Sequence, residues 1–147
     1  MNLFDSLSIS GSALLAERER SEVIATNMAN AETTHTEAGG PYHRREVVFE
    51  TPGSSSFRLA LSLSSGFKAP PSGSVHISQV IDDPSPSIRR YQPGHPDADK
   101  DGYVAYPRLN PAEDMVDLMG ASRGFQANVS AISAVKDMIQ RSLDLFR

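Results

Sequence analysis

The stretch NPAEDMVDLMGASRGFQANVSAISAVKDMIQRSLDLFR, residues 110–147, decides the expected fold of this chain. Asn110 is a good helix N-cap, Pro111 stands at the first helical position, and Glu113 follows three residues after Asn110, as in a capping box. Apolar or small residues then recur every three or four positions, which predicts one helix of about 50 Å. A repeat sustained over about four heptads indicates a coiled coil between subunits. The stripe consists of Met115, Leu118, Ser122, Phe125, Val129, Ile132, Lys136, Ile139, Leu143 and Phe146, with Val135 beside its single break at Lys136.

A second, weaker helical stripe lies at the other end of the chain, in residues 3–31. Its apolar or small residues are Leu3, Leu7, Ser10, Leu14, Ser21, Ala25 and Met28. The polar run 17–22 interrupts this stripe, so we expect a tight or wet contact there. Two amphipathic ends need a partner stripe, which is either each other or a neighbouring copy. The pattern therefore indicates assembly.

The middle of the chain has a different character. It holds nine of the ten prolines, and short β-like runs at 45–49, 57–63, 75–81 and 103–106 alternate with turn-forming clusters. The predicted fold class is α+β: long N- and C-terminal helices pair as a coiled coil, with a small antiparallel β domain inserted between them. The expected domains are an N-terminal axial helix (1–31), a loop and β-rich insertion (32–109) and a C-terminal axial helix (110–147).

Composition argues against several classes of function. The net charge is −4 and no run of Lys and Arg exceeds two residues, so we expect no nucleic-acid partner. The absence of cysteine rules out disulfides, thiolate metal sites and cysteine nucleophiles. The first residues match neither a signal peptide nor a membrane span, so any export would not use a cleavable signal, and we expect no direct membrane span.

The acidic stretch 97–103 is the basis of an alternative function, a calcium-dependent binding module. Asp97, Asp99 and Asp101 followed by Gly102 match the first half of an EF-hand loop. The twelfth position is Arg108, where bidentate coordination needs Glu, and nearby prolines leave no room for flanking helices. The favoured interpretation is a tight turn in which Asp side chains accept backbone N–H groups and Gly102 takes a positive φ before a strand.

No other motif suggests chemistry. The four histidines lack metal-ligand spacing, and no serine stands in a nucleophile elbow, so we expect no catalytic residue, metal, cofactor or small-molecule substrate. A soluble hydrolase with an unrecognised site is a second alternative. Gly120 and Gly124 form a small-x-x-x-small pair, which favours close helix approach in an assembly over a kink. Arg123 is either a solvated charge or an ion-pair partner across helices.

Several segments resemble bacterial flagellar rod and hook subunits, the axial proteins. Residues 27–33 are similar to the N-terminal signature of that family, and residues 113–129 to its C-terminal signature. Residues 40–42, 93–99 and 102–104 are similar to the proximal rod members. Gly124 and Phe125 stand where such proteins usually have Ala and Tyr.

The resemblance implies terminal helices that pair and pack with other subunits into a tube at the base of the flagellum. The implied location is the periplasmic rod of the basal body, reached through the flagellar type III apparatus. The implied partners are other copies of the chain, other rod proteins, and the adaptor between the rod and the MS ring. The expected assembly residues are Leu7, Leu14, Ile24, Met28, Asn30, Met115, Leu118, Arg123, Phe125, Val129, Ile132, Ile139 and Leu143.

Overall fold

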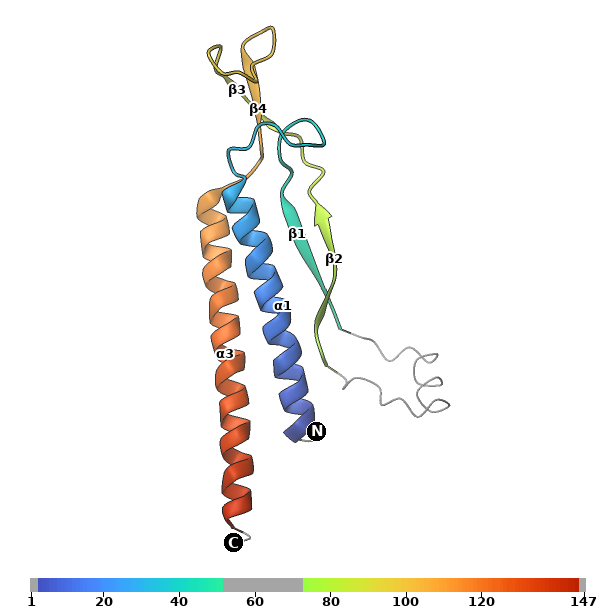
Figure 1. Cartoon of the computed structure of the whole chain (residues 1–147), viewed down its shortest axis with the longest axis vertical. Coiled ribbons are helices and arrows are strands. Elements are labelled where there is room, and N and C mark those ends of the chain that lie inside the picture. Colours follow the sequence, from blue (N-terminus) through green and yellow to red (C-terminus); the bar gives the residue numbers. More distant parts are fainter. Residues whose placement is uncertain (1–2, 52–72, 146–147) are drawn as a thin grey trace, which may run out of the picture. The chain divides into compact units, whose positions relative to one another are not determined.

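The computed structural model, which describes residues 3–51 and 73–145, contains two long helices and four short strands (Figure 1). This arrangement of paired helices and small antiparallel sheets confirms the predicted α+β class. The elements follow in the order α1 (Leu3–Ala29), β1 (Arg45–Glu50), β2 (His76–Asp82), β3 (Ile88–Tyr91), β4 (Tyr103–Tyr106) and α3 (Pro111–Asp144).

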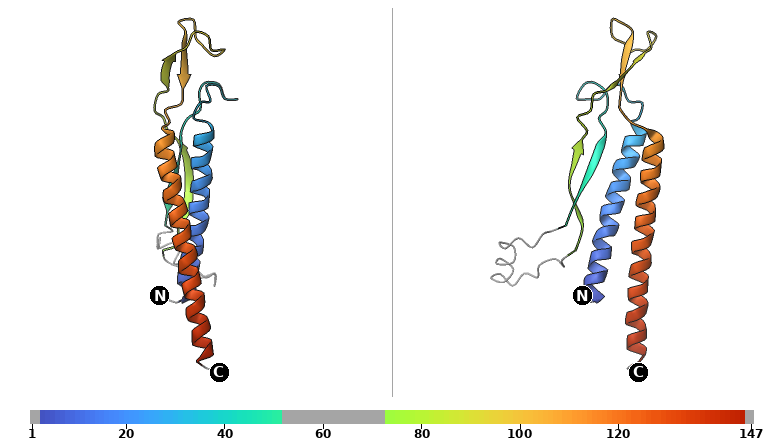
Figure 2. Two further views of the ribbon diagram at one scale, coloured as in Figure 1. Left: turned by 90° about the vertical axis from the view of Figure 1, so that its left-hand side faces the viewer. Right: turned by 180° about the vertical axis from the view of Figure 1, so that it is seen from behind.

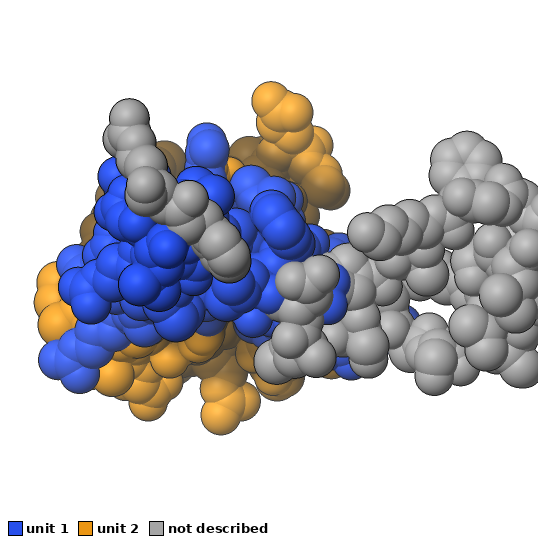
Figure 3. Space-filling view, turned by 90° about the horizontal axis from the view of Figure 1, so that it is seen from below, with its two compact units in different colours: residues 1–19, 49–78, 121–147 blue, residues 20–48, 79–120 orange. Residues whose placement is uncertain are grey.

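The chain divides into two compact units, coloured separately in Figure 3. Unit 1 comprises residues 1–19, 49–78 and 121–147, and unit 2 comprises residues 20–48 and 79–120. Each unit therefore contains a segment of α1 and a segment of α3. Within each unit the two helix segments lie side by side and run in opposite directions (Figure 2).

Small residues lie at the helix contact in unit 1. Ala16 of α1 and Ala121 of α3 are buried, and a Cβ added to Gly124 would lie 3.1 Å from Glu17 Oε1. Gly124 therefore lies close to α1 within the chain, whereas a Cβ at Gly120 would meet nothing within 4 Å among the described residues, and close approach to helices of other copies stays a prediction for both.

The start of α3 in unit 2 follows the sequence signals. The Ala112 N–H donates to Asn110 Oδ1 at 3.2 Å, and Pro111 is the first helical residue. The N-cap prediction is confirmed. A cap of this kind satisfies an N–H group that the first turn of a helix leaves without an intrahelical partner.

The strands form two two-stranded sheets, β1 with β2 and β3 with β4. Strands β1, β2 and β4 confirm the runs predicted at 45–49, 75–81 and 103–106, whereas the run predicted at 57–63 lies outside the described residues. Strand β3 was missed: it pairs antiparallel with β4, in a register that sets Ile88 opposite Tyr106. Its sequence Ile-Arg-Arg-Tyr has no apolar alternation, and the buried side chains Val104 and Tyr106 belong to β4.

Candidate assembly interface

The side chain of Asn27, buried near the end of α1, holds the start of β1. Its Nδ2 donates to the Arg45 carbonyl at 2.8 Å, and its Oδ1 accepts from the Arg45 N–H at 2.9 Å and from the Tyr42 hydroxyl at 2.9 Å. Only 1% of Asn27 is exposed. The amide thus bonds both backbone groups of one residue, as a neighbouring strand would.

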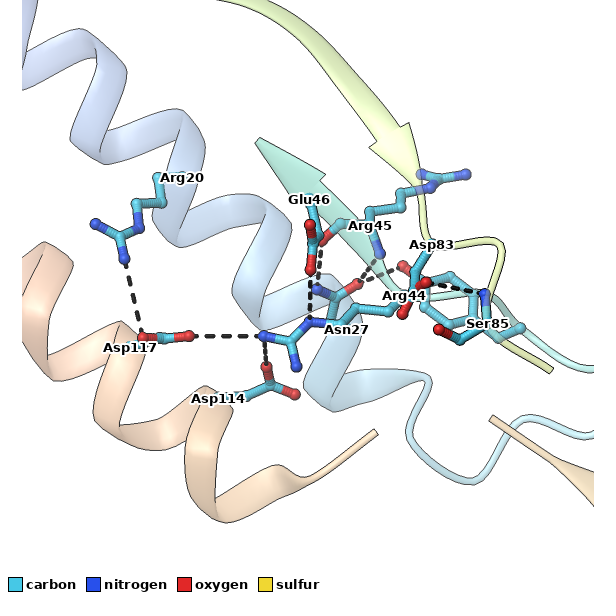
Figure 4. A network of polar contacts seen from close by, with 10 residues as sticks. Arg20, Asn27, Arg44, Arg45, Glu46, Asp83, Ser85, Asp114 and Asp117 are labelled. Atoms are coloured by element: carbon cyan, nitrogen blue, oxygen red, sulfur yellow. Dashed lines mark hydrogen bonds and ion pairs between the residues drawn. The ribbon is translucent and has the colours of Figure 1, made fainter. Parts of the chain in front are cut away.

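Arg44 is the centre of a polar network in unit 2 (Figure 4). Its Nη2 lies 3.0 Å from Asp114 Oδ1 and 3.6 Å from Asp117 Oδ2, both on α3. Arg20 of α1 reaches Asp117 Oδ1 at 3.9 Å, and Glu46 Oε1 of β1 lies 3.8 Å from Arg44 Nε. Arg44, which precedes β1, therefore links the start of that strand to α3, and Asp117 in turn links α3 to Arg20 of α1.

Asp114 is the fully buried member of this network. Burial raises the pKa of its carboxyl; the Arg44 guanidinium opposes the rise, and the neighbouring carboxylates of Asp117 and Glu113 reinforce it. Among the described residues, neither carboxylate oxygen of Asp114 has a hydrogen-bond partner, so the ion pair with Arg44 is what compensates its burial. A carboxylate in this position is costly without its arginine.

Sequence reasoning placed Asn27 and Asp114 within the two family signatures but predicted none of these contacts, and it assigned no role to Arg44. One signal was present: Asp114 precedes Ala121, Asn128 and Val135 at exact seven-residue intervals. A charged residue in line with the residues that form a helix–helix contact indicates that the charge is buried and paired with an opposite charge. The partner itself, Arg44, lies 70 positions away in the sequence, and nothing in the sequence identifies it.

The predicted assembly residues divide into covered and exposed sets. Ile24 is buried, and the half-buried members are Leu7, Leu14, Met28, Asn30, Leu118, Ile132 and Ile139. The exposed members are Met115, Arg123, Phe125, Val129 and Leu143. The first set is largely covered within the chain and the second is more exposed, and the assembly role of both sets stays a prediction.

Asn30 has a local role at the end of α1. Its Nδ2 donates to the Thr26 carbonyl at 2.9 Å, and its Oδ1 accepts from the Thr33 hydroxyl at 3.1 Å. These bonds satisfy a carbonyl in the last turn of the helix and begin the following loop.

The acidic stretch 97–103 forms the expected tight turn. Asp99 Oδ1 accepts the N–H groups of Asp101 at 3.0 Å and Tyr103 at 2.9 Å, Gly102 has a φ of +80°, and Arg89 pairs with the other Asp99 oxygen. The hydrogen bond from the Tyr103 N–H is the main cause that holds the pKa of Asp99 below its ordinary value, aided by Arg89.

Nothing among the described residues supports the calcium-dependent alternative. Residues 3–51 and 73–145 contain no group of three or more His, Cys, Asp or Glu side chains placed to hold a metal ion. The part of the chain that the structure describes also includes no helix with the length and apolar character that a membrane span requires.

Comparison with known proteins shows the family to which the chain belongs. The profile of the family described as "Flagellar basal body rod FlgEFG protein C-terminal" matches residues 100–145. The flagellar basal-body rod protein FlgC of Bacillus subtilis is 37% identical over 149 residues, which cover 99% of both chains. The chain belongs to the FlgC family.

Other members of the FlgC family match over the same length. The protein from Yersinia enterocolitica is 37% identical, covering 99% of this chain and 96% of its own. The protein from Borreliella burgdorferi is 33% identical and covers 100% of this chain and 99% of its own. Both helices and the region between them therefore belong to one FlgC-type chain, and the resemblance to flagellar axial proteins is confirmed.

Proposed function

We propose that this chain is a structural subunit of the flagellar basal-body rod, which assembles through its terminal helices into a shaft that transmits torque. The observation that carries the proposal is the apolar surface of α3. While Asp114 and Ala121 are buried, Met115, Val116 and Met119 are all about half exposed or more. A helix that is apolar outside its intramolecular contact is typical of a subunit covered by neighbours.

The energetics favour assembly over an independent fold. Apolar burial contributes roughly 25 cal/mol per Å², so helix contacts with several neighbours stabilise a subunit well beyond its own small core. The chain's own buried apolar residues among those described are mostly small or medium in size, such as Ala16, Ala121 and Val135. A rigid shaft follows when many such contacts act in parallel.

The proposal includes partners, location and the absence of catalysis. The partners are other copies of the chain, other flagellar rod proteins and the adaptor between the rod and the MS ring. The location is the periplasmic rod of the flagellar basal body. The role is mechanical, with no enzymatic activity, which agrees with the names of the related rod proteins.

Complementation of a strain that lacks its own copy of this protein tests the proposal. Replacing Met119 by Asp places a charge on the exposed face of α3, and we expect loss of swimming although the variant is expressed and folded. Glu37→Gln, in an exposed loop, is the matched control and should swim normally. Failure of the unmodified chain to restore swimming, or full swimming of Met119→Asp, would contradict the proposal.

A further inference from the structure

The last turns of α3 extend past the described start of α1. In unit 1, Gly124 lies against Glu17, so antiparallel helices with equal rise bring Leu3 level with about residue 138 of α3. The segment from Ile139 to the end of α3 therefore has no described part of α1 beside it. Leu143 is 65% exposed and Leu145 is 86% exposed. We call residues 136–145, the last turns of α3 and the residue that follows them, the tail of α3.

The tail continues the apolar seam of the helix pair. Val135 is buried, Ile139 follows four residues later and is half-buried, and Leu143 follows after four more. Residues four apart lie on one face of a helix, so this row passes from a covered position into an exposed one. An apolar row that continues beyond its intramolecular partner helix is suited to pack against a helix from another chain.

The first turns of the same helix present a second unpartnered face in unit 2. Met115 is 55% exposed, Val116 63% and Met119 48%. Next to them an open groove of about 480 Å³ is lined by Arg44, Ala112, Glu113, Val116 and Asp117. We call residues 111–120 the head of α3.

Charge distinguishes the two faces. Glu113 at the head and Lys136 at the tail each form no ion pair with any residue in the described ranges. Lys136 precedes Ile139 by three positions and Leu143 by seven, which places it along the apolar row. In addition, the C-terminal end of one helix carries a partial negative charge and the N-terminal end of another a partial positive charge, so a staggered, parallel arrangement brings complementary helix dipoles together.

We propose that the tail of α3 in one copy packs on the head of α3 in a second copy, with Lys136 on the same side as the neighbour's Glu113. The two patches differ, so the contact is head-to-tail and leaves a free head at one end of the assembly and a free tail at the other. Contacts of this type generate open filaments. The inference rests on the proposed rod function and names the surfaces that meet.

Disulfide trapping tests the contact directly, because the chain has no cysteine of its own. Val116→Cys carrying a size tag is mixed with untagged Leu143→Cys at assembling concentration and oxidised. We expect the mixed disulfide to exceed either homodimer several-fold. The control replaces Leu143→Cys by Leu15→Cys, which is equally exposed on α1 at 64% and should give no enrichment of mixed disulfide.

Charge reversal tests the same contact without a cross-link. Glu113→Lys and Lys136→Glu should each raise the concentration needed for self-association by about three- to fivefold, and the double variant should return toward the unmodified chain. Far-ultraviolet circular dichroism checks that all three variants fold alike. Additive effects in the double variant, or equal trapping of Leu15→Cys and Leu143→Cys, would overturn the inference. A chain that restores swimming yet shows either result retains the rod function and loses only this contact.

Discussion

The Asn27 side chain replaces a strand neighbour for Arg45, since it bonds both the N–H and the carbonyl of that residue. A carboxylate cannot do the same, because it has no donor for the carbonyl. An apolar residue would leave both backbone groups of Arg45 and the Tyr42 hydroxyl without their partner. The position is therefore specific for an amide of this length.

Replacing Asn27 by Ala should lower the free energy of unfolding by about 2–3 kcal/mol, because buried polar groups lose their partners. Urea denaturation followed by circular dichroism measures the change. Asn30→Ala is the matched control: its side chain bonds only within the end of α1, and we expect a loss of no more than about 1 kcal/mol. Equal losses for the two variants would contradict the assigned role of Asn27.

Asp114 should make folding stability fall as pH rises in the acidic range. Burial raises its pKa, so between the ordinary and the raised value the folded chain binds more protons than the unfolded chain, and the free energy of unfolding decreases with pH. Asp114→Asn should remove this fall. Urea denaturation at a series of pH values measures it, with Glu37→Gln as the control for loss of a carboxylate. A steeper fall in the Asn variant would refute the assignment.

The carboxyl group of Asp99 should change folding stability with pH in the direction opposite to that of Asp114. Its pKa is lowered, chiefly by the hydrogen bond from the Tyr103 N–H, so its contribution to stability is present above the ordinary value and is lost as pH falls through the folded value. Asp99→Asn should therefore lose least stability, relative to the unmodified chain, at the most acidic pH. The same series of urea denaturations measures how each carboxyl group affects stability. If the free energy of unfolding changed with pH in the same way in Asp114→Asn and Asp99→Asn, the opposite pKa directions of the two carboxyls would be contradicted.

At the scale of elements, alanine substitutions at the two glycines of α3 separate the effect of close helix packing on stability from the effect of helix propensity. Gly120 faces open space, so Gly120→Ala should stabilise the chain by about 0.5–1 kcal/mol. Gly124→Ala gains the same propensity but places its Cβ 3.1 Å from Glu17 Oε1, so we expect less stabilisation or none. Thermal denaturation of the pair measures the difference. A larger gain at Gly124 than at Gly120 would show that α1 is not close there.

Elements whose signals are local could be predicted from the sequence. The Asn110 cap, the positive φ of Gly102 and the turn around Asp99 each depend on residues within a few positions of one another. Strand β3 could not be predicted from the sequence because its pairing with β4, and not its own residue pattern, determines it. The contacts of Arg44 with Asp114, and of Asn27 with Arg45, join distant parts of the chain, and each residue type is common on exposed surfaces. Only the fold brings them together.

At the scale of the whole molecule, few large apolar side chains are buried among the residues that the structure describes. Of the large hydrophobic residues described, many on both helices are exposed, including Phe4, Leu15, Val116 and Leu143. In proteins, helices gain most of their stability from tertiary packing and not from propensity. The terminal helices should therefore depend on neighbours for part of their order.

The dilute chain should accordingly be less helical and more sensitive to protease at its ends than the assembled chain. Circular dichroism at 222 nm should show helix content rising with protein concentration, because association stabilises the ordered form by mass action. Limited proteolysis at low concentration should cut within α1 and in the tail of α3 before the β3–β4 hairpin, where Val104 is fully buried. The Lys136→Glu variant is the matched comparison: it should need more protein to reach the same helicity. Complete helicity and resistant ends in the dilute monomer would mean that the helices are ordered before assembly.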